Sequence, residues 1–294
     1  MNTSLENSVS VESSAPVDAI APSVAIKAGF SPWRNLWGLL NNRYVLYMIS
    51  IIGFLLVWHW AAVASRFSSY MPTPMEVLNE LTRLSQDRLA GKNLWGHLWA
   101  SLYRVLIGFL IGSAIGVPVG LFMALNRHVN AIVKPVFDLF KPMPPISWIS
   151  LSILWFGIGE ESKIFIIVIG AFVPALINSY NGIRLVDPAL YDAIRMLGAR
   201  GWKVYYHVTI PAAFPALFAG LQIALSIAWG CVLAAELVGA RAGMGFIIIL
   251  GMNVSKPAMI VGGMVVIAVT AYLITFTLSK LERWVCPWKV ELPQ

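Results

Sequence analysis

The sequence is poor in charge and in cysteine. Only 12% of its 294 residues are Asp, Glu, Lys or Arg, whereas a soluble domain carries about 25%. This shortage, together with 58% hydrophobic residues, excludes an ordinary soluble domain. The two cysteines, Cys231 and Cys286, form no CxxC pair, which argues against a disulfide framework and a thiolate metal site. We expect no metal and no cofactor.

Catalytic motifs are also missing. The sequence contains no HExxH, no GxSxG and no pair of inward-facing carboxylates on one apolar run. The glycine-rich stretch 239–245, GARAGMG, predicts a tight turn, because the chain has no GxxxxGK[ST] loop that could hold ATP. The chain is therefore predicted not to be an enzyme, and any energy from ATP would have to come from another subunit.

Long apolar runs dominate instead. A membrane-spanning helix needs about 20 apolar residues, and the sequence predicts six spans within 44–288, namely 44–65, 100–125, a broken run between 135 and 155, 163–183, 211–238 and 258–278. An exposed amphipathic helix is expected at 75–89, after Pro72 and Pro74. The predicted fold class is an all-α integral membrane protein.

The ends of the chain differ in composition from the predicted spans. Residues 1–30, rich in Ser, Ala, Val and Pro, are predicted to be a disordered cytoplasmic terminus, and 289–294 a short tail. Residues 31–43 carry Trp33, Leu36, Trp37 and Leu40 at i, i+3, i+4 and i+7, which predicts a helix lying on the membrane surface.

The basic residues indicate the orientation. Six spans place both termini on one side, and the segments on that side hold 13 of the 21 Lys and Arg residues, so we expect it to be the cytoplasm. The net charge of +7 is then explained by topology and not by nucleic acid binding. A multi-pass protein of the inner (cytoplasmic) membrane is expected, with the lipid bilayer as its surroundings.

Four glycines recur at every fourth residue of the second span. They are Gly108, Gly112, Gly116 and Gly120. Because glycine lets two helix backbones approach closely in lipid, this stripe predicts helix packing and implies no chemistry.

Two features are candidates for a pathway. Pro144 and Pro145, close to Pro142, remove backbone donors within the third span, so the helix should kink or unwind there. Broken helices often line transport paths, and we include Trp148 in this candidate, but a prolyl kink is equally an ordinary packing device. Glu236, near the outer end of the fifth span, is either a gate residue or an interfacial carboxylate. In the second case it would pair with Arg241 or Arg104 or bond to backbone; an anionic substrate would be repelled by it.

The polar loop 187–211 interrupts the apolar second half. Asp187 before Pro188 predicts a helix start, and Gly198 can end that helix. One face of the helix is apolar and is expected to pack on the bundle, namely Leu190, Ala193, Ile194 and Leu197. Asp192 and Arg195 lie opposite, and a second short helix is expected from Trp202 to Tyr206, before Pro211.

This loop resembles the EAA loop of permease subunits of binding-protein-dependent ABC importers. That signature reads EAA, three residues, Gly, nine residues and I-x-L-P. It falls here on Asp192, Ala193, Ile194, Gly198, Val208, Ile210 and Pro211. The spacing is kept, although Asp192 and Ile194 depart from the pattern. Further segments resemble the nitrate, sulfonate and taurine branch, namely 72–78, 101–109, 141–163, 228–246 and the dipeptide Pro287-Trp288.

The resemblance implies a fold and a set of partners. It implies the MetI-like fold of type I importer permeases, paired with a second permease copy, two cytoplasmic ATP-binding subunits, and a periplasmic or lipid-anchored substrate-binding protein. The ATPase-coupling residues would be Asp192, Ala193, Ile194, Arg195, Gly198, Arg200, Val208, Ile210 and Pro211.

The resemblance also bears on the substrate. It favours a small anion, first an alkanesulfonate such as taurine, with nitrate, bicarbonate or another small organic molecule as the alternative. An ion-coupled secondary transporter is a further alternative, which inverted repeats or mid-span charges would favour; the sequence has neither clearly.

Overall fold

The computed structural model describes residues 43–64 and 70–288. The predicted disordered segment 1–30, most of the predicted surface helix 31–43 and the tail 289–294 lie outside this part. The chain divides into two compact units: the first ends at Phe54 and the second begins at Leu55. Apart from one isolated bridge between Leu89 and Lys92, all regular structure in the described residues is helical.

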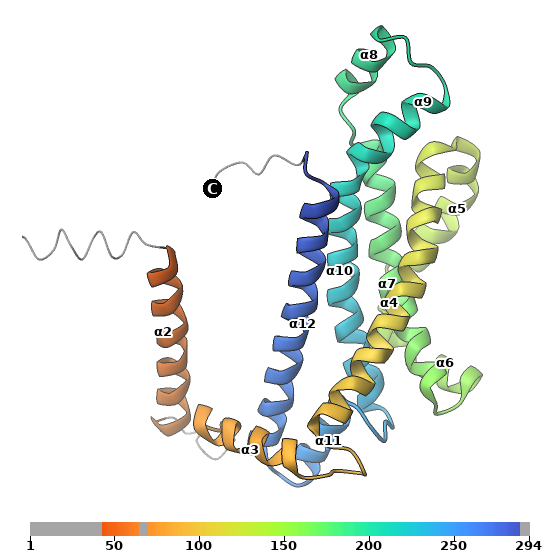
Figure 1. Ribbon diagram of the computed structural model, residues 1–294. Helices are drawn as coiled ribbons and strands as arrows, with labels where there is room; N and C mark the ends of the chain where they lie inside the picture. The colour runs from red at the N-terminus through yellow and green to blue at the C-terminus, as the bar shows by residue number, and fades with distance from the viewer. Residues whose placement is uncertain (1–42, 65–69, 289–294) are drawn as a thin grey trace, which may run out of the picture. The chain divides into compact units, whose positions relative to one another are not determined.

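Five helices in the described ranges are long and apolar enough to cross a membrane. They are α2 (Arg43–Ala64), α4 (Leu94–Leu125), α7 (Glu160–Arg184), the stretch Trp202–Leu237 that contains α10 (Ile210–Leu237), and α12 (Pro257–Val285). They correspond to the first, second, fourth, fifth and sixth predicted spans. In the second unit α7 packs between α4 and α10, and α12 packs against α10 (Figure 1).

The third predicted span is divided into short helices. Helix α5 (Arg127–Phe140) has 14 residues, and after a break come the 3₁₀ turn η1 (Pro145–Trp148) and α6 (Ile149–Phe156). The break coincides with Pro142, Pro144 and Pro145, whose nitrogens cannot donate to a helical ladder. The run is therefore broken, as the sequence predicts, and neither helical piece is of spanning length.

The glycine stripe of α4 lies against α7. A Cβ atom on Gly112 would lie 2.6 Å from the carbonyl oxygen of Val168, and one on Gly116 would lie 2.8 Å from that of Phe172. Gly120 meets a carbonyl oxygen of α7 in the same way, whereas a Cβ atom on Gly108 would meet the side chain of Ile167. Near the other end of α7, a Cβ atom on Gly182 would lie 3.1 Å from the carbonyl oxygen of Ala213 on α10. We call α4, α7 and α10 the three-helix core, since their backbones are in close contact.

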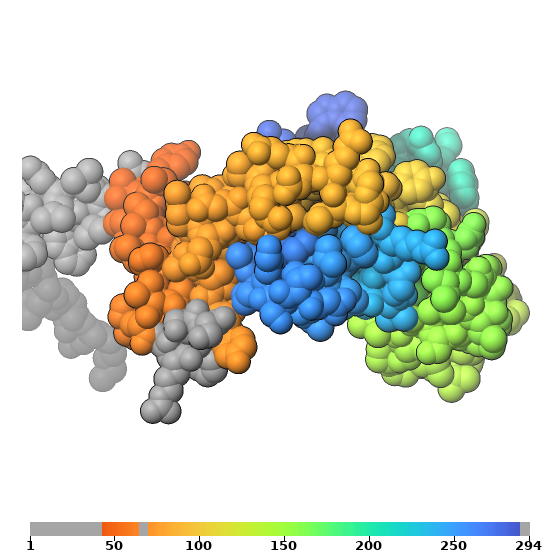
Figure 2. Space-filling model, turned by 90° about the horizontal axis from the view of Figure 1, so that it is seen from below, coloured from red at the N-terminus to blue at the C-terminus, as the bar shows by residue number. Residues whose placement is uncertain are grey.

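Two short helices lie at the end of the second unit away from loop 187–211 (Figure 1). The amphipathic helix α3 (Pro74–Gln86) is confirmed; it begins in a capping box of Thr73 and Glu76 and packs on α12. Helix α11 (Met244–Asn253) follows the glycine turn and was not predicted. Seen from that end, the start of α4, helix α11 and the α6–α7 region lie side by side (Figure 2).

Candidate functional site

The polar loop begins with a short capped helix. Helix α8 (Pro188–Met196) starts after Asp187, whose carboxylate accepts a 2.8 Å hydrogen bond from the amide of Ala189. It ends at Gly198, where φ is +83°, a conformation that side chains with a Cβ rarely adopt. Both ends therefore lie where the sequence predicts them.

The second half of the loop is part of the fifth span. Helix α9 (Trp202–Val204) leads into a π-helical turn, η2 (Tyr205–Thr209), which continues directly into α10. In this turn the amide of Ile210 donates to the carbonyl of Tyr205, five residues back. Pro211 lacks an amide proton and its ring crowds the carbonyl four residues earlier, so a wider turn suits this position. The predicted separate short helix is thus corrected to a continuous helical stretch, Trp202–Leu237.

The apolar face of α8 is exposed, which corrects the expectation that it packs on the bundle. The exposed fraction is 46% for Leu190 and 86% for Leu197, and neighbouring Met196 reaches 88%. No residue of α8, which is described in full, is buried. The loop is held instead by its C-terminal part, where Val204 and Thr209 are buried and Val208, Ile210 and Pro211 are half-buried.

The polar positions of the loop also face outward. Asp192 and Arg195 form a loose ion pair, with 3.9 Å between the nearest nitrogen and oxygen atoms, and both side chains are mostly exposed. Arg195 and Arg200 line a hollow of about 500 Å³ between α8 and α9, together with Tyr191 and Tyr205. Apolar, cationic and aromatic groups are therefore presented together at one end of the protein.

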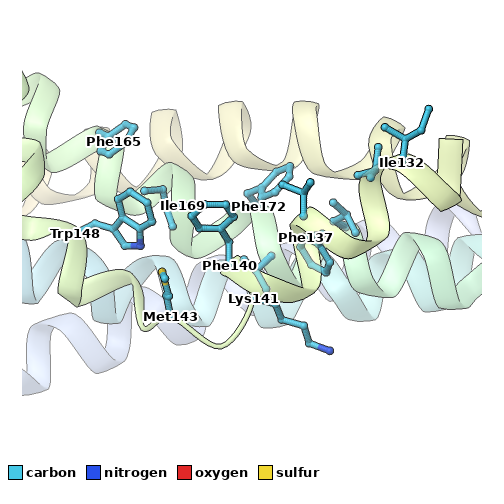
Figure 3. Close-up of a pocket in the computed structure, with 13 residues that line it drawn as sticks. Ile132, Phe137, Phe140, Lys141, Met143, Trp148, Phe165, Ile169 and Phe172 are labelled. Atoms are coloured by element: carbon cyan, nitrogen blue, oxygen red, sulfur yellow. The ribbon is translucent and has the colours of Figure 1, made fainter.

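A groove of about 560 Å³ separates α5 and η1 from α7 (Figure 3). Trp148 lines it, Pro145 begins the turn that carries Trp148, and Pro144 precedes that turn. Lys141 also belongs to the lining, but its side chain points away from the aromatic residues. The rest of the lining is apolar, namely Ile132, Val133, Val136, Phe137, Phe140, Met143, Phe165, Ile169, Phe172, Val173 and Leu176.

A smaller hollow of about 180 Å³, with a mixed polar and apolar lining, adjoins the groove. The two cavities share Phe137, Lys141 and Leu176. The smaller one adds four polar side chains, namely Lys134, Asp138, Tyr180 and Asn181, and the first two form an ion pair. The proline break thus lies beside a surface that is apolar at one end and polar at the other.

Glu236 does not line this groove. Its carboxylate is buried among α4, α10 and α11, where Ser101 Oγ donates at 2.7 Å, Arg104 Nη1 at 2.6 Å and the amide of Gly245 at 2.8 Å. The sequence left Glu236 as either a gate residue or a carboxylate paired with an arginine or with backbone. In the structure it pairs with Arg104 and with the backbone amide of Gly245, whereas Arg241 is exposed. The four candidate pathway residues are therefore not brought together.

Comparison with known proteins supports a transport role. Residues 116–289 match the family model described as binding-protein-dependent transport system inner membrane component. The taurine transport system permease protein TauC of Escherichia coli (strain K12) is 32% identical over 273 residues, covering 92% of this chain and 99% of the relative. The putative aliphatic sulfonates transport permease protein SsuC of Bacillus subtilis (strain 168) is 32% identical over 269 residues, covering 92% and 93%. The bicarbonate transport system permease protein CmpB of Synechococcus elongatus is 30% identical over 271 residues, covering 88% and 94%.

Solved structures agree on the fold. Two inward-facing structures of the MetNI methionine ABC transporter superpose with TM-scores of 0.54 and 0.55, at 23% and 22% identity. They cover 64% and 70% of this chain and 93% and 98% of the matched chains. The chain therefore belongs to the family of binding-protein-dependent transport system inner membrane components, and it has the MetI-like fold of ABC importer permeases.

Proposed function

We propose that this permease imports a small organic anion, first an alkanesulfonate such as taurine, with ATP hydrolysed by a separate subunit bound to loop 187–211. The observation that carries the proposal is the exposed apolar face of α8, which includes Leu190 and Leu197. Exposed apolar side chains on a capped helix are typical of a surface that a partner covers.

The loop is suited to transmit movement. Helix α8 is joined through Gly198 and α9 to an uninterrupted helical stretch that includes all of α10. A displacement of α8 by an ATPase subunit would therefore act on α10, and through the close contacts of the three-helix core on α7 and α4. In this proposal Asp192, Arg195 and Arg200 meet the ATPase, and Val208, Ile210 and Pro211 anchor the loop to the bundle.

The groove between α5 and α7 is proposed as one wall of the pathway. The break at Pro144 and Pro145 lets α5 and α6 take different directions beside it. A second permease copy would supply the opposite wall, and Lys141, at the edge that the groove shares with the smaller hollow, would favour an anion there. The substrate-binding protein would deliver the anion at the periplasmic end, and both chain termini would lie in the cytoplasm of an inner membrane.

The substrate preference is supported by the relatives, which include permeases for taurine, aliphatic sulfonates and bicarbonate. The alternatives are nitrate, bicarbonate or another small organic molecule. Uptake of labelled taurine, an alkanesulfonate, nitrate and bicarbonate by cells expressing the complete transporter distinguishes them. Uptake that persists after ATP depletion and collapses with the ion gradient would instead indicate an ion-coupled secondary transporter.

The docking proposal is tested on α8 itself. We expect Leu197→Asp to abolish co-purification of the ATPase subunit and ATP-driven uptake, because it places a charge in the covered apolar face. Leu197→Met is the matched control, since it keeps the apolar character, and it should retain both activities. Equal co-purification and uptake by the two variants would contradict docking through this face.

A further inference from the structure

A polar stripe crosses the otherwise apolar α4 at the end of the three-helix core away from α8. His97, Ser101 and Arg104 follow one another at i, i+4 and i+7, so they share one face of the helix. All three side chains are buried, and each contacts another helix or the turn before it. A buried ionisable group in a membrane span is costly, which makes this cluster a candidate for a function beyond packing.

The stripe and Glu236 together cap α11. The first amides of a helix have no partner within the helix and carry a partial positive charge. Here the amide of Gly243 donates to Nδ1 of His97 (3.1 Å), that of Met244 to the Ser101 hydroxyl (2.8 Å) and that of Gly245 to the Glu236 carboxylate (2.8 Å). A side chain at residue 243 would collide with the Glu236 carboxyl group. The start of α11 is therefore fixed to α4 and α10 by groups that α11 does not itself supply.

Arg104 joins this cap to the surface. Its Nη1 atom donates to Glu236 at 2.6 Å and to the carbonyl oxygen of Ala242 at 2.8 Å, whereas Nε and Nη2 donate to the two carboxylate oxygens of Glu160 at the start of α7. The side chains of Arg104 and Glu236 are 4% and 1% exposed, but that of Glu160 is 52% exposed. One guanidinium thus links α4, α7, α10 and the α10–α11 turn.

Glu236 lies at the far end of the helix that carries the polar loop. Helix α10 has 28 residues, so it is about 40 Å long. It is continuous with α9 at one end and holds Glu236 one residue before its other end. A movement of α10 must therefore act on the bonds to Arg104 and to the start of α11.

We propose that Arg104 is a positioning residue for transport, which keeps the α10–α11 turn and α11 fixed to α4 and α7 when α10 moves. The inference rests on the proposed function, because it assigns the movement of α10 to an ATPase bound at α8. Close packing already joins α4 to α7 through Gly108 and Gly112, so that contact does not depend on the arginine. Arg104 acts instead on the α10–α11 turn, through the carbonyl oxygen of Ala242, and on the start of α11, through the Glu236 carboxylate.

The test separates positioning from simple stability. Removing one partner of a buried ion pair leaves an uncompensated charge, whereas neutralising all partners does not. We therefore compare Arg104→Met with the double variant Arg104→Met, Glu236→Gln, in the complete transporter reconstituted in lipid. Glu160 is left unchanged, because it is half exposed and also pairs with the buried Lys163. The double variant should regain the thermal stability that the single variant loses. Its uptake per ATP hydrolysed should still fall at least tenfold.

Hydrogen exchange gives a readout that does not need transport. In the double variant the amides of residues 243–247 should exchange at least tenfold faster than in the unmodified protein, while those of α7 next to the glycine stripe should not change. Arg83→Met is the matched control, because Arg83 also pairs with two carboxylates, Glu80 and Asp87, but lies exposed on α3.

Each result has one meaning. A stable double variant with unchanged exchange in α11, or with unchanged uptake per ATP, overturns the role of Arg104. Absence of ATP-driven uptake by the unmodified transporter overturns the proposed function instead, and the exchange measurement still decides whether Arg104 holds α11.

Discussion

The backbone of α7 occupies the space that a side chain on α4 would need: a Cβ atom on Gly112 would lie 2.6 Å from the carbonyl oxygen of Val168. A real Cβ atom does not approach an oxygen so closely, so the two helices would have to separate. The same relationship recurs at Gly116, where the distance to the carbonyl oxygen of Phe172 is 2.8 Å. The close approach therefore involves backbone atoms, which adjust less readily than side chains.

The first prediction follows from this contact. Gly112→Ala should destabilise the protein by about 1–3 kcal/mol, the range for overpacking a close-packed interior, and Gly112→Val should cost more. Gly230→Ala on α10 is the control, because no atom lies within 4 Å of its Cβ position. Thermal unfolding in detergent measures the difference. An equal melting temperature for Gly112→Ala and Gly230→Ala would contradict the packing described for α4 and α7.

The second prediction concerns Gly198. Its φ of +83° costs a residue with a Cβ about 1–2 kcal/mol, but no atom lies within 4 Å of the added Cβ. We expect Gly198→Val to insert and fold, while ATP hydrolysis is uncoupled from uptake because the direction of α8 changes. Gly198→Asn should be milder, since Asn tolerates this conformation. Normal uptake with normally stimulated hydrolysis in the valine variant would refute this role.

A third prediction concerns a hydrogen bond between α10 and α12. Gln222 Nε2 donates a 2.8 Å hydrogen bond to the buried carboxylate of Glu282. Gln222→Leu should lower stability by about 1.5–3 kcal/mol, as expected for a lost hydrogen bond to a charged group. Ser226→Ala on the same helix is the control, because the hydroxyl bonds only to the carbonyl of Gln222 one turn earlier. The two melting temperatures, measured side by side, check this difference.

The fourth prediction tests whether the α5–α7 groove faces water in the assembled transporter. Both native cysteines, Cys231 and Cys286, are buried, so they should react slowly with a water-soluble thiol reagent. Phe140→Cys should react quickly if the groove is one wall of the pathway, and the delivered substrate should slow the reaction. Leu273→Cys on the exposed apolar surface of α12 should stay unreactive in lipid. If Phe140→Cys is equally unreactive, the groove does not line the pathway.

Features that depend on nearby residues could be predicted from the sequence. The apolar runs, the helix start at Asp187, the turn at Gly198 and the break near Pro144 all follow from local chemistry, and the structure has each of them. The spacing of the glycines also indicated which side of α4 packs closely. These signals need no knowledge of which helix lies next to which.

Features that depend on pairing between distant helices could not be predicted. Helix α11 is too short to span a membrane, and its start is capped by residues of α4 and α10, so its own sequence carries no cap signal. The partner of Glu236 remained a choice between Arg104 and Arg241, because the two lie on different elements. The exposure of Leu197 could not be predicted for a related reason. An apolar helix face indicates that other residues cover it, but not whether those residues belong to the same chain.

The spacing of His97, Ser101 and Arg104 is a further signal in the sequence. Three polar residues on one face of an apolar span predict a buried polar contact, even when the partner is unknown. The ion pair of Glu160 with Arg104 could not be predicted, because a carboxylate in the first turn of a helix is common and needs no partner.

The π turn before Pro211 also determines the direction in which the polar loop leaves the bundle. Each residue of an α-helix advances about 100° around the axis and 1.5 Å along it. The extra residue in the turn Tyr205–Thr209 therefore sets the angle at which α9 and α8 extend from α10. Deleting a single residue there would rotate α8 by about a quarter of a turn around the axis of α10 without altering any of its side chains. The direction of this loop therefore depends on the number of residues in the turn as well as on their identity.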